Sequence, residues 1–253
     1  MIKGLVLKST GSWYRVKDEH GSIINCNVRG KLRIQGLKST NPVAVGDYVN
    51  FEIENLKENT GVIKDVIDRK NYIIRKSTNL SKKCHIIAAN IDRAFLIVTI
   101  AVPETSLEFI DRFLASAEAY RIPVTIVFNK MDLYVEEHIE YMYSLIDMYE
   151  KIPYESIAIS ALKGTNMEQL KLMMKDKINL IAGNSGVGKS KIINSIQPDL
   201  HLKVGDISEY HLMGKHTTTF AEMFELDFGG YIIDTPGIKG FGVIDMDKNE
   251  LYH

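Results

Sequence analysis

The stretch INLIAGNSGVGKSKIINSI, residues 178–196, places a short apolar strand, a glycine-rich turn and a predicted helix in succession. Residues 183–190 match the pattern G-x-x-x-x-G-K-[ST] in full, which in this setting is typical of a phosphate-binding loop. The glycines let the backbone turn successive N–H groups toward phosphate oxygens, and the helix N-terminus adds partial positive charge. The sequence therefore predicts a nucleotide phosphate site, with the residues Gly183, Asn184, Ser185, Gly186, Val187, Gly188, Lys189, Ser190 and Lys191.

Two stretches supply candidate ligands for a Mg²⁺ ion beside these phosphates. In the phosphate loop, Lys189 is expected to reach the β- and γ-phosphates and Ser190 to bind the metal. The stretch YIIDTPG, residues 231–237, is an apolar strand that brings Asp234 to a sheet edge, where a Mg²⁺ site needs a carboxylate. Gly237 then offers an N–H to the γ-phosphate.

A third candidate segment, GKHTTTF at 214–220, lies between these two stretches. A threonine here can close on Mg²⁺ and the γ-phosphate as a mobile switch. Thr217 and Thr218 both fit this role, and Thr218 is our preference. His216 precedes them and is either a functional side chain or an exposed loop histidine.

The stretch VTIVFNKMD, residues 124–132, is a strand followed by a candidate base-binding motif. The carboxylate of Asp132 can accept hydrogen bonds from both N1–H and the 2-amino group of guanine, which adenine cannot match. Asn129 can bind the O6/N7 side, and the Lys130 stem can cover the ring. Such a site rejects the wrong base because mismatched polar groups remain unpaired. In IAISALKG, 157–164, the backbone of Ser160 and Ala161 can contact guanine O6.

The order of these motifs is unusual, because the base-binding motif precedes the phosphate loop along the chain. Most Ras-like GTPases have the opposite order. Circular permutation explains the difference simply, since folds tolerate new termini when the old ones lie close together at the surface. We therefore predict a circularly permuted GTPase that binds GTP or GDP.

The coarse pattern of the chain predicts two domains. Residues 1–70 contain short β-rich segments separated by Gly and Asn, as in a small all-β OB-fold barrel. Residues 71–253 alternate strands with helices over 106–120, 136–151, 166–176 and 189–196, as in an α/β P-loop domain with a mostly parallel sheet. Residues 86–100 are interpreted as one strand, and 65–83 as the linker.

Positive charge is concentrated in the N-terminal part of the chain. Residues 1–70 carry 12 Lys/Arg against 8 Asp/Glu, a surplus of 12 − 8 = +4 in a chain of net charge -1. Four of these positive residues, and no negative one, lie between Arg29 and Lys38, which indicates either a solvated basic loop or a nucleic-acid footprint. Trp13 can stack on bases or pack inside the barrel.

The sequence indicates neither a membrane helix nor a set of disulfides. No apolar run reaches the ~18–20 residues of a membrane helix, and two cysteines make no disulfide framework. We therefore expect a cytoplasmic protein without membrane contact.

With a barrel-like N-terminus and then NKMD, SALKG, GNSGVGKS, GKHTTT and DTPGIKGFG in that order, the chain resembles the RsgA (YjeQ/YloQ) family of circularly permuted, small ribosomal subunit-dependent GTPases. The resemblance covers essentially the whole chain. It implies an OB-fold that binds ribosomal RNA, and a GTPase that binds the small ribosomal subunit and hydrolyses GTP during its late maturation. We expect a monomer.

The resemblance also implies how hydrolysis proceeds. The family has an apolar residue after the D-x-x-G glycine, where many GTPases have a water-positioning glutamine, and Ile238 matches this pattern. We therefore expect slow hydrolysis by the chain alone and stimulation by the small subunit. The family's candidate replacement for the glutamine carries over to His216, so the predicted catalytic residues are His216, Lys189 and Thr218.

One feature departs from the family. Its members normally continue into a C-terminal domain that holds zinc through three Cys and one His. This chain has only Cys26 and Cys84, both upstream of the GTPase motifs, so we expect no zinc in these residues.

Three other interpretations of the sequence stay open. The chain could be a permuted GTPase that acts on the large ribosomal subunit, although the N-terminal barrel argues against this. It could be an RNA-binding module that only senses GTP or GDP, because Ile238 cannot orient water. An ATP-dependent kinase is disfavoured by Asn129, Lys130 and Asp132.

Overall fold

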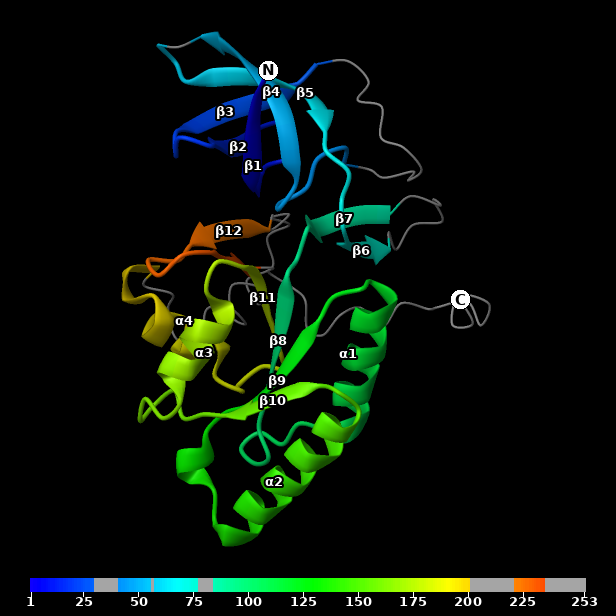
Figure 1. The fold of residues 1–253 in the computed structure, drawn as a ribbon, viewed down its shortest axis with the longest axis vertical. Helices are drawn as coiled ribbons and strands as arrows, with labels where there is room; N and C mark the ends of the chain where they lie inside the picture. Colours follow the sequence, from blue (N-terminus) through cyan, green and yellow to red (C-terminus); the bar gives the residue numbers. More distant parts are fainter. Residues whose placement is uncertain (30–40, 56, 77–83, 201–220, 235–253) are drawn as a thin grey trace, which may run out of the picture. The chain divides into compact units, whose positions relative to one another are not determined.

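The structure, a computed structural model, describes residues 1–29, 41–55, 57–76, 84–200 and 221–234. The chain divides into two compact units, one built mainly from Met1–Ile91 and the other beginning at Asp92 (Figure 1).

The first unit contains a closed five-stranded barrel. Its strands are β1 (Ile2–Ser9), β2 (Tyr14–Asp18), β3 (Ile23–Val28), β4 (Tyr48–Asn55) and β5 (Thr60–Val66). They follow the order β1-β2-β3-β5-β4, and β4 pairs back onto β1. Only the β3–β5 pairing among these is parallel. The predicted OB-like barrel is therefore confirmed.

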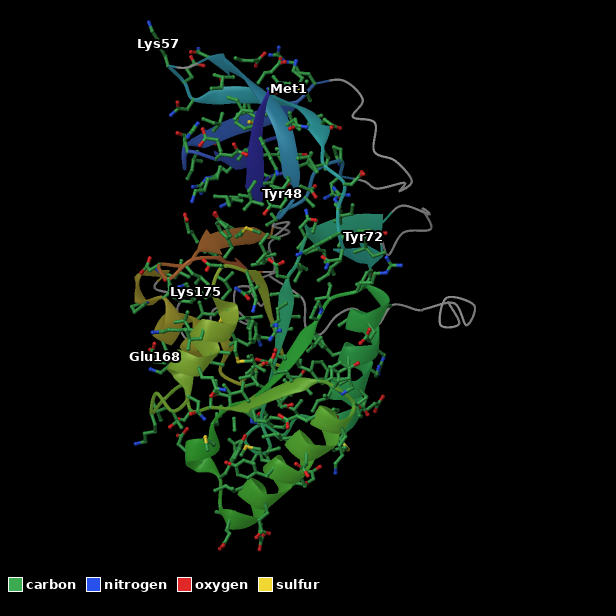
Figure 2. The ribbon with its side chains drawn as sticks, viewed as in Figure 1. Met1, Tyr48, Lys57, Tyr72, Glu168 and Lys175 are labelled. Carbon is green, nitrogen blue, oxygen red and sulfur yellow. The ribbon has the colours of Figure 1, made fainter. Side chains whose placement is uncertain are left out.

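Buried and exposed residues alternate along much of the barrel strands, and the buried ones form the core of the barrel. Inward residues pack together as a buried cluster that contains Val6, Tyr14, Val16, Ile24, Cys26, Phe51 and Ile63. Trp13 is 47% exposed and so lies outside this core. The ring of Tyr48, labelled in Figure 2, faces the Lys3 ammonium, with Nζ 5.2 Å from the ring centroid.

Two more strands belong to the same unit and pair with each other, namely β6 (Tyr72–Lys76) and β7 (Cys84–Ala89). The interpretation of 65–83 as a linker is therefore wrong over β6. The strand predicted over 86–100 is also wrong, because it is broken into β7 and the next strand, β8 (Arg93–Val98). Asn90 interrupts it with a left-handed φ of 56° and donates from Nδ2 to the Gly46 carbonyl at 2.9 Å.

The second unit contains a parallel sheet. Its strands β10 (Glu155–Ala158), β9 (Val124–Phe128), β8 and β11 (Ile178–Ala182) lie in that order, and every neighbouring pair is parallel. β9 is buried along its whole length, which explains its continuous apolar sequence. The chain then forms β12 (Glu222–Glu225) and β13 (Tyr231–Asp234), and the Tyr231 N–H donates to the Lys177 carbonyl at 2.8 Å.

The predicted helices are confirmed. They are α1 (Leu107–Ala119), α2 (Glu136–Lys151), α3 (Met167–Met174) and α4 (Lys189–Ile196). In the view of Figure 1, α3 and α4 lie on one side of the strands and α1 on the other. Glu168, labelled in Figure 2, lies in the first turn of α3, and Lys175 follows its last turn. No helix in the described ranges is long and apolar enough to cross a membrane.

This topology determines where a ligand can bind. Parallel strands have their carboxyl ends at the same edge of a sheet, and open α/β sheets bind ligands at that edge. The segments after β8, β9 and β11 therefore meet, although they are far apart in the sequence.

Candidate active site

The phosphate loop connects the end of β11 to the start of α4. Gly183, Gly186 and Gly188 have φ values of 142°, 83° and 99°, a region that only glycine adopts readily. Lys189 folds back over the loop, and its Nζ donates to the carbonyls of Gly183 and Asn184 at 2.7 and 2.6 Å. No side chain caps the first turn of α4, so its N–H groups suit an anion.

Asn129 connects the base-binding motif to the phosphate loop. Its side chain is buried, with 2% exposure, and lies directly after β9. Nδ2 donates to the Val187 carbonyl at 2.8 Å, while Oδ1 accepts from the Ala161 N–H at 3.2 Å. The structure therefore brings three predicted segments together through one side-chain amide.

The contact between Asn129 and the phosphate loop requires Gly188. A Cβ at position 188 would lie 2.4 Å from Asn129 Nδ2, well inside van der Waals contact. Gly188 thus serves both the turn of the loop and its close approach to Asn129.

Asp132 is held by the segment after β10. It lies in a short 3-10 turn, Met131–Leu133, and its Oδ1 accepts a hydrogen bond from the Ser160 hydroxyl. Ser160 Oγ in turn accepts from the Lys163 N–H at 3.0 Å. This arrangement orients the carboxylate, as recognition of a base edge requires.

Lys130 lies between these two side chains with a left-handed φ of 67°. Its Nζ donates to the Val102 carbonyl at 2.6 Å, in the segment between β8 and α1. The neighbouring Pro103 faces the phosphate loop, because a Cβ at Gly186 would lie 3.3 Å from Pro103 Cδ.

Comparison with known proteins decides the family. The family model of the RsgA N-terminal domain matches residues 3–63 of the sequence, and the family model of the RsgA GTPase matches residues 66–244. The chain belongs to the RsgA GTPase family. It is 56% identical to the small ribosomal subunit biogenesis GTPase RsgA of Phocaeicola vulgatus, over all of this chain and 81% of that protein. It is 54% identical to the small ribosomal subunit biogenesis GTPase RsgA 2 of Bacteroides thetaiotaomicron, with the same coverage.

Solved structures of RsgA-type proteins agree with this assignment. YjeQ from Thermotoga maritima matches with a TM-score of 0.73 and 38% identity, over 93% of this chain and 74% of that one. YloQ, described as a circularly permuted GTPase, matches with a TM-score of 0.73 and 28% identity, over 99% and 76%. The predicted permuted GTPase fold is therefore confirmed. The match to the RsgA GTPase family also confirms the predicted hydrolysis of GTP to GDP.

Ser190 and Asp234 were predicted to bind Mg²⁺, and this assignment stays a prediction. Ser190 is the second residue of α4 and Asp234 is the last residue of β13, and hydroxyl and carboxylate oxygens suit this hard cation. Mg²⁺ held by oxygen ligands of this kind would neutralise charge on the β- and γ-phosphates. Within the described residues there is no group of three or more His, Cys, Asp or Glu side chains that could hold a metal, and the zinc expectation stays a prediction.

His216, Thr217, Thr218 and Gly237 lie outside the described residues, so their roles stay predictions. Lys191 lies in the first turn of α4 and is exposed.

One residue of the site was not predicted from the sequence. Tyr134 is 8% exposed, donates its hydroxyl proton to the Asn129 carbonyl at 2.5 Å and accepts from the Ile100 N–H at 2.8 Å. Burial raises the pKa of Tyr134, the Ile100 hydrogen bond lowers it and nearby Asp132 raises it, so the hydroxyl keeps its proton at neutral pH. An aromatic residue with a polar tip two positions after a binding motif was the available signal.

Proposed function

We propose that this chain binds the small ribosomal subunit, hydrolyses GTP slowly alone and rapidly on that subunit, and acts in its late maturation in the cytoplasm. The observation that carries the nucleotide part is the Asn129 bridge, which holds the base-binding motif against the phosphate loop. The names of relatives more than half identical over the whole chain support the ribosomal part.

The proposed nucleotide contacts follow from the geometry. An amide nitrogen has two donors, so Asn129 can keep its bond to Val187 and still donate to guanine N7. Asp132 would accept from N1–H and the 2-amino group, and the Lys130 stem would cover the ring. Lys189 would exchange two neutral carbonyls for phosphate oxygens, since hydrogen bonds between charged groups are about twice as strong.

The barrel is proposed to contact ribosomal RNA, with residues 1–70 as RNA-binding domain and 71–253 as GTPase. Arg15, Arg29 and Lys64 have side chains 45%, 68% and 45% exposed, and each is paired with a glutamate. Exposed ion pairs contribute only ~0–1 kcal/mol, so these cations can exchange a carboxylate for a phosphate at little cost. Exposed Trp13 offers a base-stacking surface.

The test is GTP hydrolysis by the purified chain alone, with small ribosomal subunits, and with large subunits as control. We expect a slow basal rate and strong stimulation by small subunits only, and we expect His216→Ala to lose the stimulation while GDP still binds. Stimulation by large subunits instead, or GTP binding with no stimulation by either, would contradict the proposed partner. A fast rate without ribosomes, or a stimulated His216→Ala, would contradict the catalytic assignment.

A further inference from the structure

The Tyr134 hydroxyl joins the ends of two adjacent strands. β8 and β9 run parallel, with Val98 paired to Phe128. Beyond these ends, the Tyr134 hydroxyl accepts from the Ile100 N–H and donates to the Asn129 carbonyl. One hydroxyl thus satisfies a backbone group of each segment.

Both of these backbone groups adjoin residues of the predicted nucleotide site. The Asn129 carbonyl belongs to the peptide between Asn129 and Lys130, and the orientation of this peptide determines where both side chains point. On the other strand, Ile100 begins the segment whose Val102 carbonyl accepts from Lys130 Nζ and whose Pro103 lies against Gly186. Tyr134 therefore holds the base-binding motif and the segment that contacts the phosphate loop in a fixed relation.

The ring of Tyr134 is itself anchored. It meets His138 of α2 edge-on, with ring centroids 6.0 Å apart and an interplanar angle of 73°. A Phe at this position would keep the ring packing and remove only the hydroxyl oxygen. The chemistry of the hydroxyl can therefore be tested separately from the packing of the ring.

We propose that Tyr134 is a positioning residue for guanine recognition, whose hydroxyl holds the Asn129–Lys130 peptide in the orientation that the base requires. Tyr134 touches no nucleotide and acts through Asn129. This inference rests on the proposed assignment of Asn129 and Asp132 as the guanine-binding residues.

The test compares the affinities of Tyr134→Phe and wild-type chain for GDP and inosine diphosphate, which lacks the 2-amino group. We expect the Kd for GDP to rise about tenfold in the variant, the effect of one lost hydrogen bond between buried groups. The preference for GDP over inosine diphosphate should fall by at least about threefold, because a displaced motif reads the base edge less well. A purely structural role would lower the melting temperature and leave this preference unchanged.

Tyr149→Phe is the matched control. Tyr149 is also buried, and its hydroxyl donates to Asp111 Oδ1 at 2.9 Å, between α2 and α1 rather than beside the nucleotide. Its GDP affinity and base preference should equal those of the wild type. A Tyr134→Phe Kd within twofold of wild type, or an equal weakening in Tyr149→Phe, would overturn the proposal. Failure of the wild type to bind GDP would instead overturn the guanine-site assignment, and the inference with it.

Hydrogen exchange of the wild-type chain keeps the proposal testable if Tyr134→Phe folds poorly. Because the Tyr134 hydroxyl joins the two segments, we expect GDP bound at Asn129 to protect the Ile100 amide, on the other side of the hydroxyl, together with residues 129–131. Protection of 129–131 without any change at Ile100 would overturn the coupling.

Discussion

Asn129 uses its side-chain amide to connect Val187 and Ala161, 58 and 32 residues away along the chain. The motif N-K-x-D predicted that Asn129 faces a base, because its amide chemistry and its place after a strand are visible in the sequence. The bond to Val187 was not predictable, since it depends on how close two loops approach in space. Tyr134 stands two residues after the motif, which was visible in the sequence, but it was missed because its hydrogen-bond partners are backbone groups that meet only in the folded chain.

At the residue scale, Gly188→Ala should separate the Asn129 motif from the phosphate loop. The new Cβ would lie 2.4 Å from Asn129 Nδ2 at a φ of 99°, so both a clash and backbone strain oppose the native geometry. We expect GDP affinity to fall at least about tenfold, which corresponds to about 1.4 kcal/mol. Calorimetric titration with GDP measures the loss.

Gly21→Ala is the control for strain alone. Gly21 has a φ of +87°, and its nearest potential contact is Lys17 Cε at 3.9 Å, in the barrel. This variant should be slightly less stable and bind GDP normally. Normal GDP binding by Gly188→Ala would show that the close approach to Asn129 is unimportant.

At the scale of elements, helices α1 to α4 were predictable because apolar residues recur at helical spacing and Ser106 caps α1 by accepting from the Phe109 N–H at 3.3 Å. The strand β6 was not predictable, because it is short and is flanked by Arg, Lys and Asn residues of the kind found in linkers. Its surroundings are fixed by tertiary hydrogen bonds: Asn41 Nδ2 and Oδ1 both bind the backbone of Ile86, and Asn71 does the same with Ile91.

The ion pair between Asp47 and Arg69 belongs to the same region, and Arg69→Met should destabilise it strongly. Arg69 Nε and Nη2 donate to the two Asp47 carboxylate oxygens, both at 2.6 Å, and the Asp47 side chain is fully buried. Removing the arginine leaves a buried carboxylate without its cation, which costs about 3–5 kcal/mol. Urea unfolding followed by the fluorescence of Trp13, the one tryptophan of the chain, reports on this unit.

Arg112→Met tests the corresponding change at the surface. Arg112 pairs with Glu108 on α1, and the two side chains are 52% and 77% exposed. This variant should change the free energy of unfolding by about 0.5 kcal/mol or less. An equally small effect for Arg69→Met would mean that the buried pair does not hold this region together.

At the scale of the whole molecule, the order of motifs predicted the permuted fold, and the structure explains how that order still produces one site. Parallel pairing of β9 with β8 and of β8 with β11 brings segments from residues 98, 128 and 182 onward to the same sheet edge. The order in which these segments occur along the sequence does not change the site that a nucleotide meets. The predicted roles of His216, Thr217 and Thr218 at the γ-phosphate belong to residues outside the described ranges and stay predictions.

The most direct test of this account is hydrolysis of GTP and of xanthosine triphosphate by wild-type chain and Asp132→Asn, with small ribosomal subunits present. Xanthine has a carbonyl where guanine has the 2-amino group, so an amide at position 132 can donate to it while still accepting from Ser160. The account predicts that Asp132→Asn loses at least about a hundredfold in kcat/KM for GTP and gains hydrolysis of xanthosine triphosphate. A variant that hydrolyses GTP as well as the wild type would contradict the assignment of Asp132 as the residue that selects guanine.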